Sequence, residues 1–409
     1  MNIGILTYFS VPNFGAQLQA LSTVGYFKKN GDNPILINWY PKSLEQYYER
    51  IISNKQIKMH DEFSLEYLPV TERCFTEDQV VDVIVKNNIE AIFIGSDALL
   101  KFMPKRLETL IRIKHFITKN KELFVVTDDR KISTPFVGNF YEKLPSKLPM
   151  VMFSVSSQDS RYKYLNLHER KIIKKELKNF TYITVRDNHT RNLVNSFLKL
   201  KNLKITPDPV FNFNDNTSFI NLPTKDDIIK KYKLPDNYVL YSFRSRKFKI
   251  DNEYSGVIAR RLLDNGLSLV AFPHPDGVQE FDLDLKIDIP LPIIDWYCLI
   301  RYSAGYIGER MHPIVVCLHN NVPFVVFDEY GNNSEKNNTS KIYHILDKAD
   351  LTEYRFGVMD DYSNPNKVVD RFLNFDTKKE ASFGKKQSAE YVDEMNKILK
   401  IFKRKGINE

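Results

Sequence analysis

The sequence predicts an α/β protein built from two doubly wound domains that face each other across a cleft. Three observations support this fold class. The 409 residues exceed what one hydrophobic core usually holds, short apolar segments alternate with helix-like segments, and the alternation breaks at a polar, turn-rich stretch, 212–224. Short buried strands between helices are typical of parallel sheets covered on both faces.

The first domain is expected over residues 1–215. It opens with an apolar strand, a loop and a helix that is ended by Asn30-Gly31. An aromatic, charged segment, 41–71, is interpreted as a partly helical insertion. The strands are expected at 3–8, 34–38, 91–94, 124–126, 151–155 and 182–185, and the helices at 16–29, 77–86 and 168–178.

The second domain is expected over residues 225–375. Its strands are expected at 238–243, 267–272, 306–307 and 323–327, and its helices at 254–264 and 313–318. Ligands of open α/β sheets bind outside the carboxyl ends of the strands. Polar motifs at those ends are therefore the candidates for a functional site.

Residues 385–405 are expected to form an amphipathic helix. Its apolar positions recur at helical spacing and are Tyr391, Met395, Ile398 and Phe402. Its last part is basic, with Lys397, Lys400, Lys403, Arg404 and Lys405. We interpret this helix as docking on the domains, with peripheral contact to a membrane surface as a further role.

Charge and composition exclude several classes of protein. Lys and Arg number 59 against 51 Asp and Glu, a net charge of +8, and no basic stripe or nucleic-acid-binding module is present. This charge suits anionic small substrates or an acidic lipid surface, although lysines that serve only solubility explain it equally well. The three cysteines make neither a disulfide framework nor a zinc cluster. Without a signal peptide or a run of about 18 apolar residues, the expected location is cytoplasmic.

The strongest local signal is the run Gly-Glu-Arg-Met-His-Pro at 308–313, between a predicted strand and a predicted helix. Pro313 suits the first helical turn, where free N–H groups and the helix dipole attract anions. Arg310 adds a donor for phosphate or carboxylate, and His312 can donate a proton near neutral pH. The run predicts an anion site with a proton source. A capped helix with Arg310 in a salt bridge and His312 buried is an equally good interpretation.

Other strand ends carry weaker signals. Arg186 is expected to face the same cleft, with Asp187 orienting it or capping the next helix. Further candidates after predicted strands are Asn13, Phe14, Gly15, Gln17, Ser96, Asp97 and His274. Asn13 and Gln17 suit sugar hydroxyls, and Asp208, between two prolines, is expected to order the crossover between the domains. Walker A, GxGxxG, GxSxG and HExxH motifs are absent.

Taken in order, these motifs resemble the polysaccharide pyruvyl transferase family from residue 3 to about residue 327. The family's N-[YF]-G-A-x-L-Q-A segment corresponds to Asn-Phe-Gly-Ala-Gln-Leu-Gln-Ala at 13–20. The remaining matches are Gly95-Ser96-Asp97, Arg186-Asp187, Asp208-Pro209, and Arg310-Met311-His312 followed by Pro323-Phe324. Each piece is weak alone, and five in the right order make the resemblance fairly specific.

The resemblance implies a glycosyltransferase-B-like fold of two Rossmann-like domains. It also implies transfer of a pyruvyl group from phosphoenolpyruvate to two hydroxyls of a sugar in a bacterial-type surface polysaccharide or its precursor, which forms a cyclic ketal and releases phosphate. No cofactor or metal is required, and an acceptor sugar carried on a polyprenol stays open as an alternative.

The resemblance also suggests roles for the candidate residues. The catalytic candidates are His312, which would protonate the enol carbon, Arg310 and Asp97. The residues expected to bind phosphoenolpyruvate are Arg186, Arg310, Met311, His312 and His274. Those expected to bind the acceptor are Asn13, Phe14, Gly15, Gln17 and Ser96.

Two other functions stay open at this point. A glycosyltransferase of the same fold would use a nucleotide-sugar donor, and Glu329 is a candidate ligand for its ribose. A non-catalytic relative that binds a sugar or an anion is the other alternative. Arg186, Arg310 and His312 argue against that relative, whereas Glu309, an acid beside the predicted anion site, argues for it.

Overall fold

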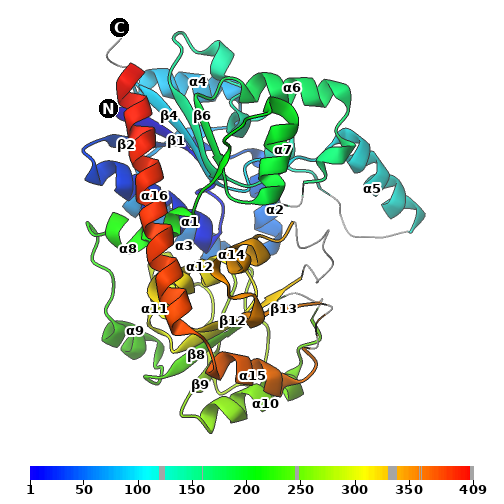
Figure 1. The fold of residues 1–409 in the computed structure, drawn as a ribbon, viewed down its shortest axis with the longest axis vertical. Helices are drawn as coiled ribbons and strands as arrows, with labels where there is room; N and C mark the ends of the chain where they lie inside the picture. The colour runs from blue at the N-terminus through cyan, green and yellow to red at the C-terminus, as the bar shows by residue number, and fades with distance from the viewer. Residues whose placement is uncertain are drawn as a thin grey trace.

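Two parallel β-sheets form the framework of the molecule, one in each half of the chain. The computed structural model describes residues 1–118, 125–158, 160–244, 248–329, 339–358, 360 and 362–405. The first half is built around a sheet within residues 2–205 and the second half around a sheet within 238–357. The two sheets lie one above the other along the long axis, and the last helix runs along one side of both (Figure 1).

The first sheet has seven parallel strands in the order β3-β2-β1-β4-β5-β6-β7. The strands are β1 (Asn2–Leu6), β2 (Asn33–Trp39), β3 (Val70–Cys74), β4 (Ala91–Asp97), β5 (Met150–Val155), β6 (Tyr182–Val185) and β7 (Lys204–Ile205). Successive side chains of a strand point to opposite faces of a sheet. Phe93 therefore packs into one hydrophobic cluster, whereas its neighbours Ile92 and Ile94 pack into another.

Helices cover both faces of this sheet. They are α1 (Phe14–Lys29), α2 (Lys42–Ile51), α3 (Asn54–Tyr67), α4 (Glu77–Lys86), α5 (Lys105–Ile117), α6 (Leu167–Leu177) and α7 (Asn188–Leu198). Asn13, Thr76 and Asp187 cap α1, α4 and α7 by accepting from backbone N–H groups of the first turn. All residues of α1 from Phe14 to Phe27 are buried, because this helix lies between the first sheet and the second half.

The second sheet has six parallel strands in the order β10-β9-β8-β11-β12-β13. The strands are β8 (Tyr238–Ser242), β9 (Ser268–Ala271), β10 (Leu285–Lys286), β11 (Gly305–Gly308), β12 (Phe324–Asp328) and β13 (Arg355–Gly357). The helices are α9 (Lys225–Tyr232), α10 (Asn252–Leu263), α11 (Ile293–Tyr302), α12 (Met311–Asn320), α14 (Lys341–Ala349) and α15 (Pro365–Leu373).

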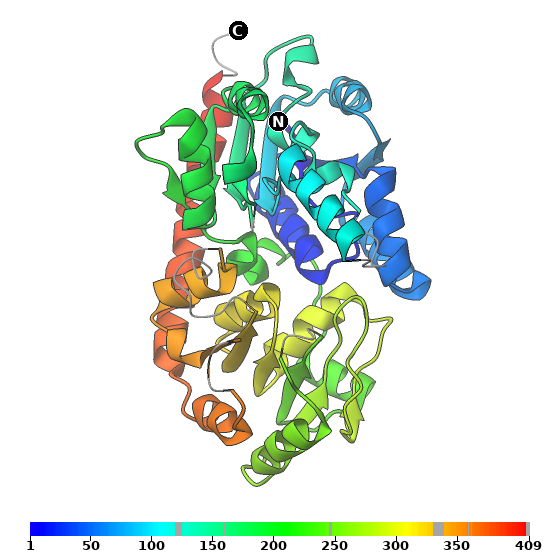
Figure 2. The ribbon, with the colours of Figure 1, turned by 90° about the vertical axis from the view of Figure 1, so that its right-hand side faces the viewer.

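The chain passes between the halves twice. It first crosses through the 3₁₀ turn Pro209–Asn212 and the short helix α8 (Phe213–Asn216), and it returns through α16 (Thr377–Lys405), which lies beside both sheets in both views (Figures 1 and 2). Tyr391 of α16 packs edge-on against Tyr26 and Phe153 of the first half. Gly384 lets α16 approach α12, because a Cβ there would lie 2.3 Å from the Leu318 carbonyl oxygen.

The doubly wound fold is confirmed, and so are the expected strands, with boundaries shifted by a few residues, except at 124–126: residue 124 lies outside the described residues, and 125–126 form no strand. Residues 41–71, expected as an insertion, form α2 and α3 and lead into β3, an edge strand that the sequence did not predict. The apolar stripe of α16 faces the protein: Tyr391, Met395, Ile398 and Phe402 are all fully buried. The docking predicted for this helix therefore uses the stripe, so the stripe itself leaves no apolar side chain exposed for contact with a membrane surface.

Candidate functional site

A cleft of about 520 Å³ opens between the two halves at the carboxyl ends of the central strands. The strand order reverses between β1 and β4 in one sheet and between β8 and β11 in the other, and such switch points are where open α/β sheets bind ligands. Eight predicted site residues line this cleft: Asn13, Phe14, Gly15, Asp97, His274, Arg310, Met311 and His312.

Arg310 connects β11 to α12 in an unusual backbone conformation. Its φ of +82° is rare for a residue with a side chain, and backbone strain of this kind tends to be kept at functional sites. Arg310 is exposed and lines the cleft. Met311 and His312 form the first turn of α12, where free N–H groups and the helix dipole favour an anion.

His312 is held by residues of the first half. Its ring packs on the backbone of α1, because a Cβ at Gly15 would lie 2.0 Å from the imidazole Cγ. Four residues further along the same helix, the Gln19 amide Nε2 lies 2.9 Å from His312 Nε2 and also hydrogen-bonds Asp208. With the amide donating to Nε2, a neutral His312 carries its proton on Nδ1.

The charge of His312 depends on opposing influences. Burial lowers the pKa of His312. The carboxylates of Asp208, 4.0 Å from Nε2, and Asp97 raise it. Burial has the larger effect, so the pKa of His312 is below its ordinary value. The imidazole is therefore mainly neutral at pH 7 when the cleft holds no ligand. A bound anion would favour the protonated form, because an opposite charge nearby stabilises the imidazolium.

Arg186 lies behind the cleft wall rather than on it. It is nearly buried, donates to Ser96 Oγ at 2.8 Å and forms an ion pair of 3.1 Å with Asp208. Asp208 thus connects Arg186 to Gln19 and, through it, to His312. Asp187 caps α7 by accepting from the Thr190 N–H, which is one of the two roles considered for it.

Asp97, at the end of β4, faces a cation from the other half. Lys341, the first residue of α14, places its Nζ 3.7 Å from Asp97 Oδ1. Burial alone would raise the pKa of Asp97, but Lys341, His312 and Arg186 outweigh it and hold the pKa below its usual value. Asp97 is therefore ionised at neutral pH. Lys341 also lines the cleft, and the sequence analysis had not singled it out.

Part of the cleft lining is aromatic and apolar. Phe14 stacks on Trp296 of α11, with ring centroids 5.1 Å apart and planes 9° from parallel, so this contact joins the two halves. Tyr47 and Tyr48 of α2 also line the cleft. Near them, Tyr8 donates to Asp129 at 2.6 Å. Such a lining offers apolar ring faces with hydrogen-bonding groups at their edges.

Three predicted site residues do not line the cleft: Arg186, described above, Gln17 and Ser96. Gln17 is fully buried, donates to the His60 carbonyl at 2.8 Å and accepts from His60 Nδ1 at 2.6 Å, so its amide is used inside the fold. Ser96 is buried and accepts from Arg186, which itself lies behind the wall. His274 does line the cleft, and burial, with help from Arg310, lowers its pKa to about 3.

A second cavity of about 530 Å³ adjoins the first and shares Arg310 and Lys341 with it. Glu309 and Glu329 line this second cavity. Glu309 accepts from the Arg244 backbone N–H at 3.2 Å. Within the described ranges, no group of three or more His, Cys, Asp or Glu residues could hold a metal ion. Likewise, no helix in the described part of the chain is long and apolar enough to cross a membrane.

The two sheets and the cleft between them define a glycosyltransferase-B-like protein with two Rossmann-like domains. The chain belongs to the polysaccharide pyruvyl transferase family, because the model of that family matches residues 13–330. No curated protein sequence matches the chain.

Solved structures are similar in fold at low sequence identity. The UDP-GlcNAc 2-epimerase of Methanocaldococcus jannaschii is 10% identical, with a TM-score of 0.56 over 97% of this chain and 100% of the epimerase. Spinosyn forosaminyltransferase SpnP is 10% identical, with a TM-score of 0.48 over 98% of this chain and 99% of that one. S. aureus MnaA, solved with UDP, is 11% identical, with a TM-score of 0.46 over 98% and 97%.

Proposed function

We propose that this protein transfers a pyruvyl group from phosphoenolpyruvate to two hydroxyls of a sugar, forming a cyclic ketal and releasing phosphate. Family membership supports this reaction. The observation that carries it is the group of cations around the first turn of α12, where Arg310 and Lys341 line the same cleft as His312. A donor with a phosphate and a carboxylate matches such a group.

In this proposal the second half binds the donor. Arg310 and the N–H groups at the start of α12 hold the phosphate, and they stabilise it as it leaves. Lys341 pairs with the carboxylate, and Arg186 contributes positive charge from behind the wall. His274 and Met311 shape the donor pocket, where the low pKa of His274 keeps its ring neutral.

The first step is the transfer of a proton from His312 to the donor. The negative charge of the bound donor raises the pKa of His312, which then protonates C3 of the enol and leaves C2 electrophilic. One sugar hydroxyl adds to C2 while Asp97 accepts its proton. Phosphate then leaves with the C2–O bonding electrons. The second hydroxyl adds to the resulting oxocarbenium carbon and gives its proton to the now neutral His312, which closes the ketal.

The first half binds the acceptor in this proposal. Tyr47 and Tyr48 of α2 suit the apolar face of a sugar ring, and Asn13 and Asp97 suit its hydroxyls. Phe14, stacked on Trp296, holds that side of the cleft in place. Gly15 takes part by positioning His312 rather than by touching the sugar. Ser96 acts in the same indirect way, through Arg186.

Calorimetric titration tests the donor assignment without knowledge of the acceptor. Phosphoenolpyruvate is expected to bind saturably, and Arg310→Ala is expected to weaken that binding about 100-fold, because charge-assisted hydrogen bonds are lost. Arg261→Ala, which removes an arginine from α10, is the matched control. Binding of a nucleotide sugar in place of phosphoenolpyruvate would instead indicate a glycosyltransferase. Unchanged binding by Arg310→Ala would remove the basis of the proposal.

A further inference from the structure

Helix α5 presents an apolar face that the described part of the chain leaves uncovered. Its N-terminal end is tied to the first half, since the Lys105 N–H donates to the Glu169 carboxylate at 2.9 Å and Leu107 is buried. On the other side, the exposed fractions are 47% for Leu110, 50% for Ile113, 86% for Phe116 and 72% for Ile117. The helix is therefore held on one side and apolar on the side facing solvent.

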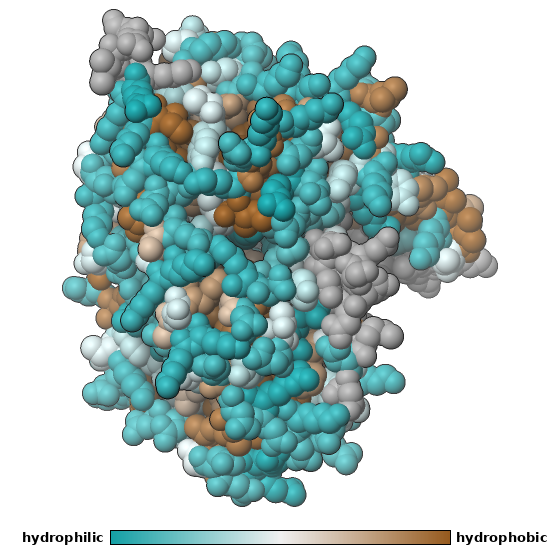
Figure 3. Space-filling view, in the orientation of Figure 1, coloured by the Kyte–Doolittle hydropathy of each residue, from teal (hydrophilic) through white to brown (hydrophobic). Residues whose placement is uncertain are grey.

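The apolar residues of α5 lie at helical spacing. Ile113 follows Leu110 by three positions, and Ile117 follows Ile113 by four, so the three side chains lie along one stripe of the helix. Phe116 flanks this stripe. In Figure 1 α5 projects from the side of the first half, and in Figure 2, turned by 90°, it lies in front of that half, toward the viewer. The space-filling view shows hydrophobic residues gathered at this projection (Figure 3).

The charges around this stripe are mostly positive. Lys105, Arg106, Arg112 and Lys114 are all exposed, and Glu108, which pairs with Arg112, is the helix's one acid. An apolar stripe flanked by basic side chains is the pattern of a helix that lies in the interface of a bilayer with anionic lipids. The cations meet the headgroups while the apolar side chains enter the acyl boundary.

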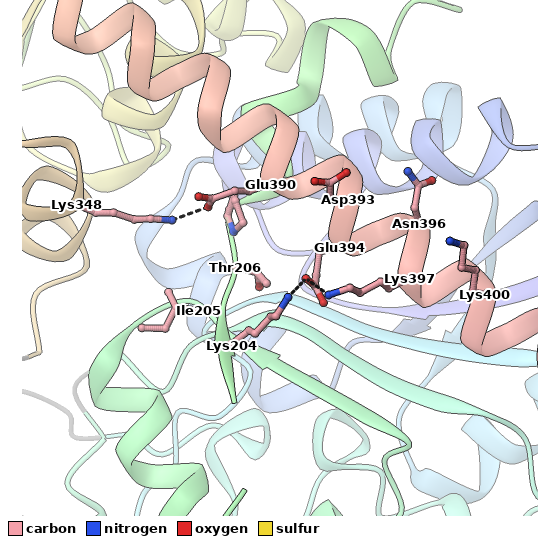
Figure 4. Close-up of a pocket in the computed structure, with 11 residues that line it drawn as sticks. Lys204, Ile205, Thr206, Lys348, Glu390, Asp393, Glu394, Asn396, Lys397 and Lys400 are labelled. Carbon is pink, nitrogen blue, oxygen red and sulfur yellow. Dashed lines mark hydrogen bonds and ion pairs between the residues drawn. The ribbon is translucent and has the colours of Figure 1, made fainter. Parts of the chain in front are cut away.

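The basic end of α16 offers no comparable surface. Its apolar stripe is buried, as described above, and Lys397 and Lys400 line a groove beside β7 together with the acids Glu390, Asp393 and Glu394 (Figure 4). In that groove Glu394 pairs with both Lys204 and Lys397, and Glu390 pairs with Lys348. The basic end of α16 therefore has no exposed apolar stripe that could add to charge attraction at a membrane. Of the two basic helices, α5 is the one that fits a membrane.

We propose that α5 docks this protein on the surface of an anionic phospholipid bilayer. Ile113, Phe116 and Ile117 enter the interface, and Arg106 and Lys114 bind lipid phosphates. The docking is adjacent to the candidate site, because Lys101, which lines the cleft, lies three residues before Pro104, the N-cap of α5. The proposal does not depend on the reaction catalysed in the cleft.

Vesicle flotation of the full chain tests this docking. The protein is expected to float with vesicles of phosphatidylglycerol and phosphatidylcholine, and to float much less with phosphatidylcholine alone or at high salt, where charge attraction is screened. Phe116→Ser together with Ile117→Ser is expected to weaken partitioning at least about tenfold, because the apolar contact is lost. Leu167→Ser is the matched control, since Leu167 is 79% exposed at the start of α6.

Three results would overturn the proposal. One is failure of the unaltered protein to bind anionic vesicles. A second is equal binding by the Phe116/Ile117 variant and the Leu167 control. The third is absence of vesicle binding together with a concentration-dependent dimer in analytical ultracentrifugation that the Phe116/Ile117 variant abolishes. That result would assign the apolar face of α5 to a second copy of the chain. Because vesicle binding is measured without phosphoenolpyruvate, none of these results bears on the proposed reaction.

Discussion

The imidazole of His312 rests against the backbone of α1 at Gly15, in space that any larger residue would fill. The two residues belong to different halves of the chain and meet where the halves face each other. Gln19, on the same side of α1, hydrogen-bonds the ring, so one helix both makes room for the imidazole and orients it. The position of the proposed proton donor is therefore set by the packing of the first half.

Gly15→Ala should displace His312. The added Cβ would lie within 2.6 Å of three ring atoms, and a displacement of about 1 Å can lower a reaction rate about 100-fold. The measurement is phosphate release from phosphoenolpyruvate with an acceptor, together with the melting temperature. Gly256→Ala is the control, because nothing lies within 4 Å of that position. Full activity of Gly15→Ala would show that the ring position does not matter.

The sequence predicted that Arg310, His312 and Asp97 would meet, because residues that follow parallel strands gather at one edge of a sheet. It placed Gln17 at the site instead of Gln19. Gly15 and Gln19 are four residues apart and share a face of α1, whereas Gln17 faces the other way, so helical spacing was a usable signal. Lys341 carried no such signal, because its distance from Asp97 depends on how the two halves pack.

At the scale of the single element, helix α16 contains a buried acid whose pKa is raised. Glu380, near the start of the helix, is fully buried beside Cys317 of α12. Neither carboxyl oxygen has a hydrogen-bond partner among the described residues. Burial raises the pKa of Glu380 to about 8, so the folded protein keeps this proton at neutral pH while the unfolded chain releases it.

Glu380→Gln should make the protein more stable at neutral pH. Between the unfolded pKa of about 4.5 and the folded pKa of about 8, the folded state binds more protons, so the free energy of unfolding falls as pH rises. Removing this effect should add about 3 kcal/mol at pH 7 and almost nothing near pH 4. Urea unfolding of both proteins from pH 4 to pH 9 measures this difference in the free energy of unfolding. The exposed Asp393→Asn on the same helix is the control, and an equal gain at every pH would contradict the explanation.

Central and edge strands differed in how well the sequence revealed them. The predicted strands, such as β4 and β8, are buried on both faces and appear as continuous apolar runs. The missed strands β3, β7, β10 and β13 lie at sheet edges, and three of them have only two or three residues. A strand that short carries no periodic pattern, so its place depends on a neighbour to pair with.

At the scale of the molecule, the two halves share one core. A single cluster of buried residues includes Phe93 of the first sheet, Phe324 of the second and Tyr391 of α16. Three further clusters are each confined to one half. The shared cluster means that neither half can unfold without exposing apolar surface of the other.

Unfolding should therefore be one cooperative transition. Trp39 lies in a cluster confined to the first half, and Trp296 lies in the shared cluster on α11. The variants Trp39→Phe and Trp296→Phe each leave one reporter, and their fluorescence midpoints in urea should coincide with the loss of helical circular dichroism, as two-state behaviour requires. Two separate midpoints would show that the halves unfold independently.

The path of α16 also affects how the protein forms during its synthesis. The surface of the first half that receives Tyr391 is made by residues up to β7, but the last turns of α16 are translated about 200 residues later, which takes roughly 10 to 40 s. Throughout that interval Phe153 and its neighbours have no α16 to cover them. Nascent chains should therefore need a chaperone at this surface, and ribosome-bound chains stalled after β7 should be captured by one more readily than chains released with α16 complete.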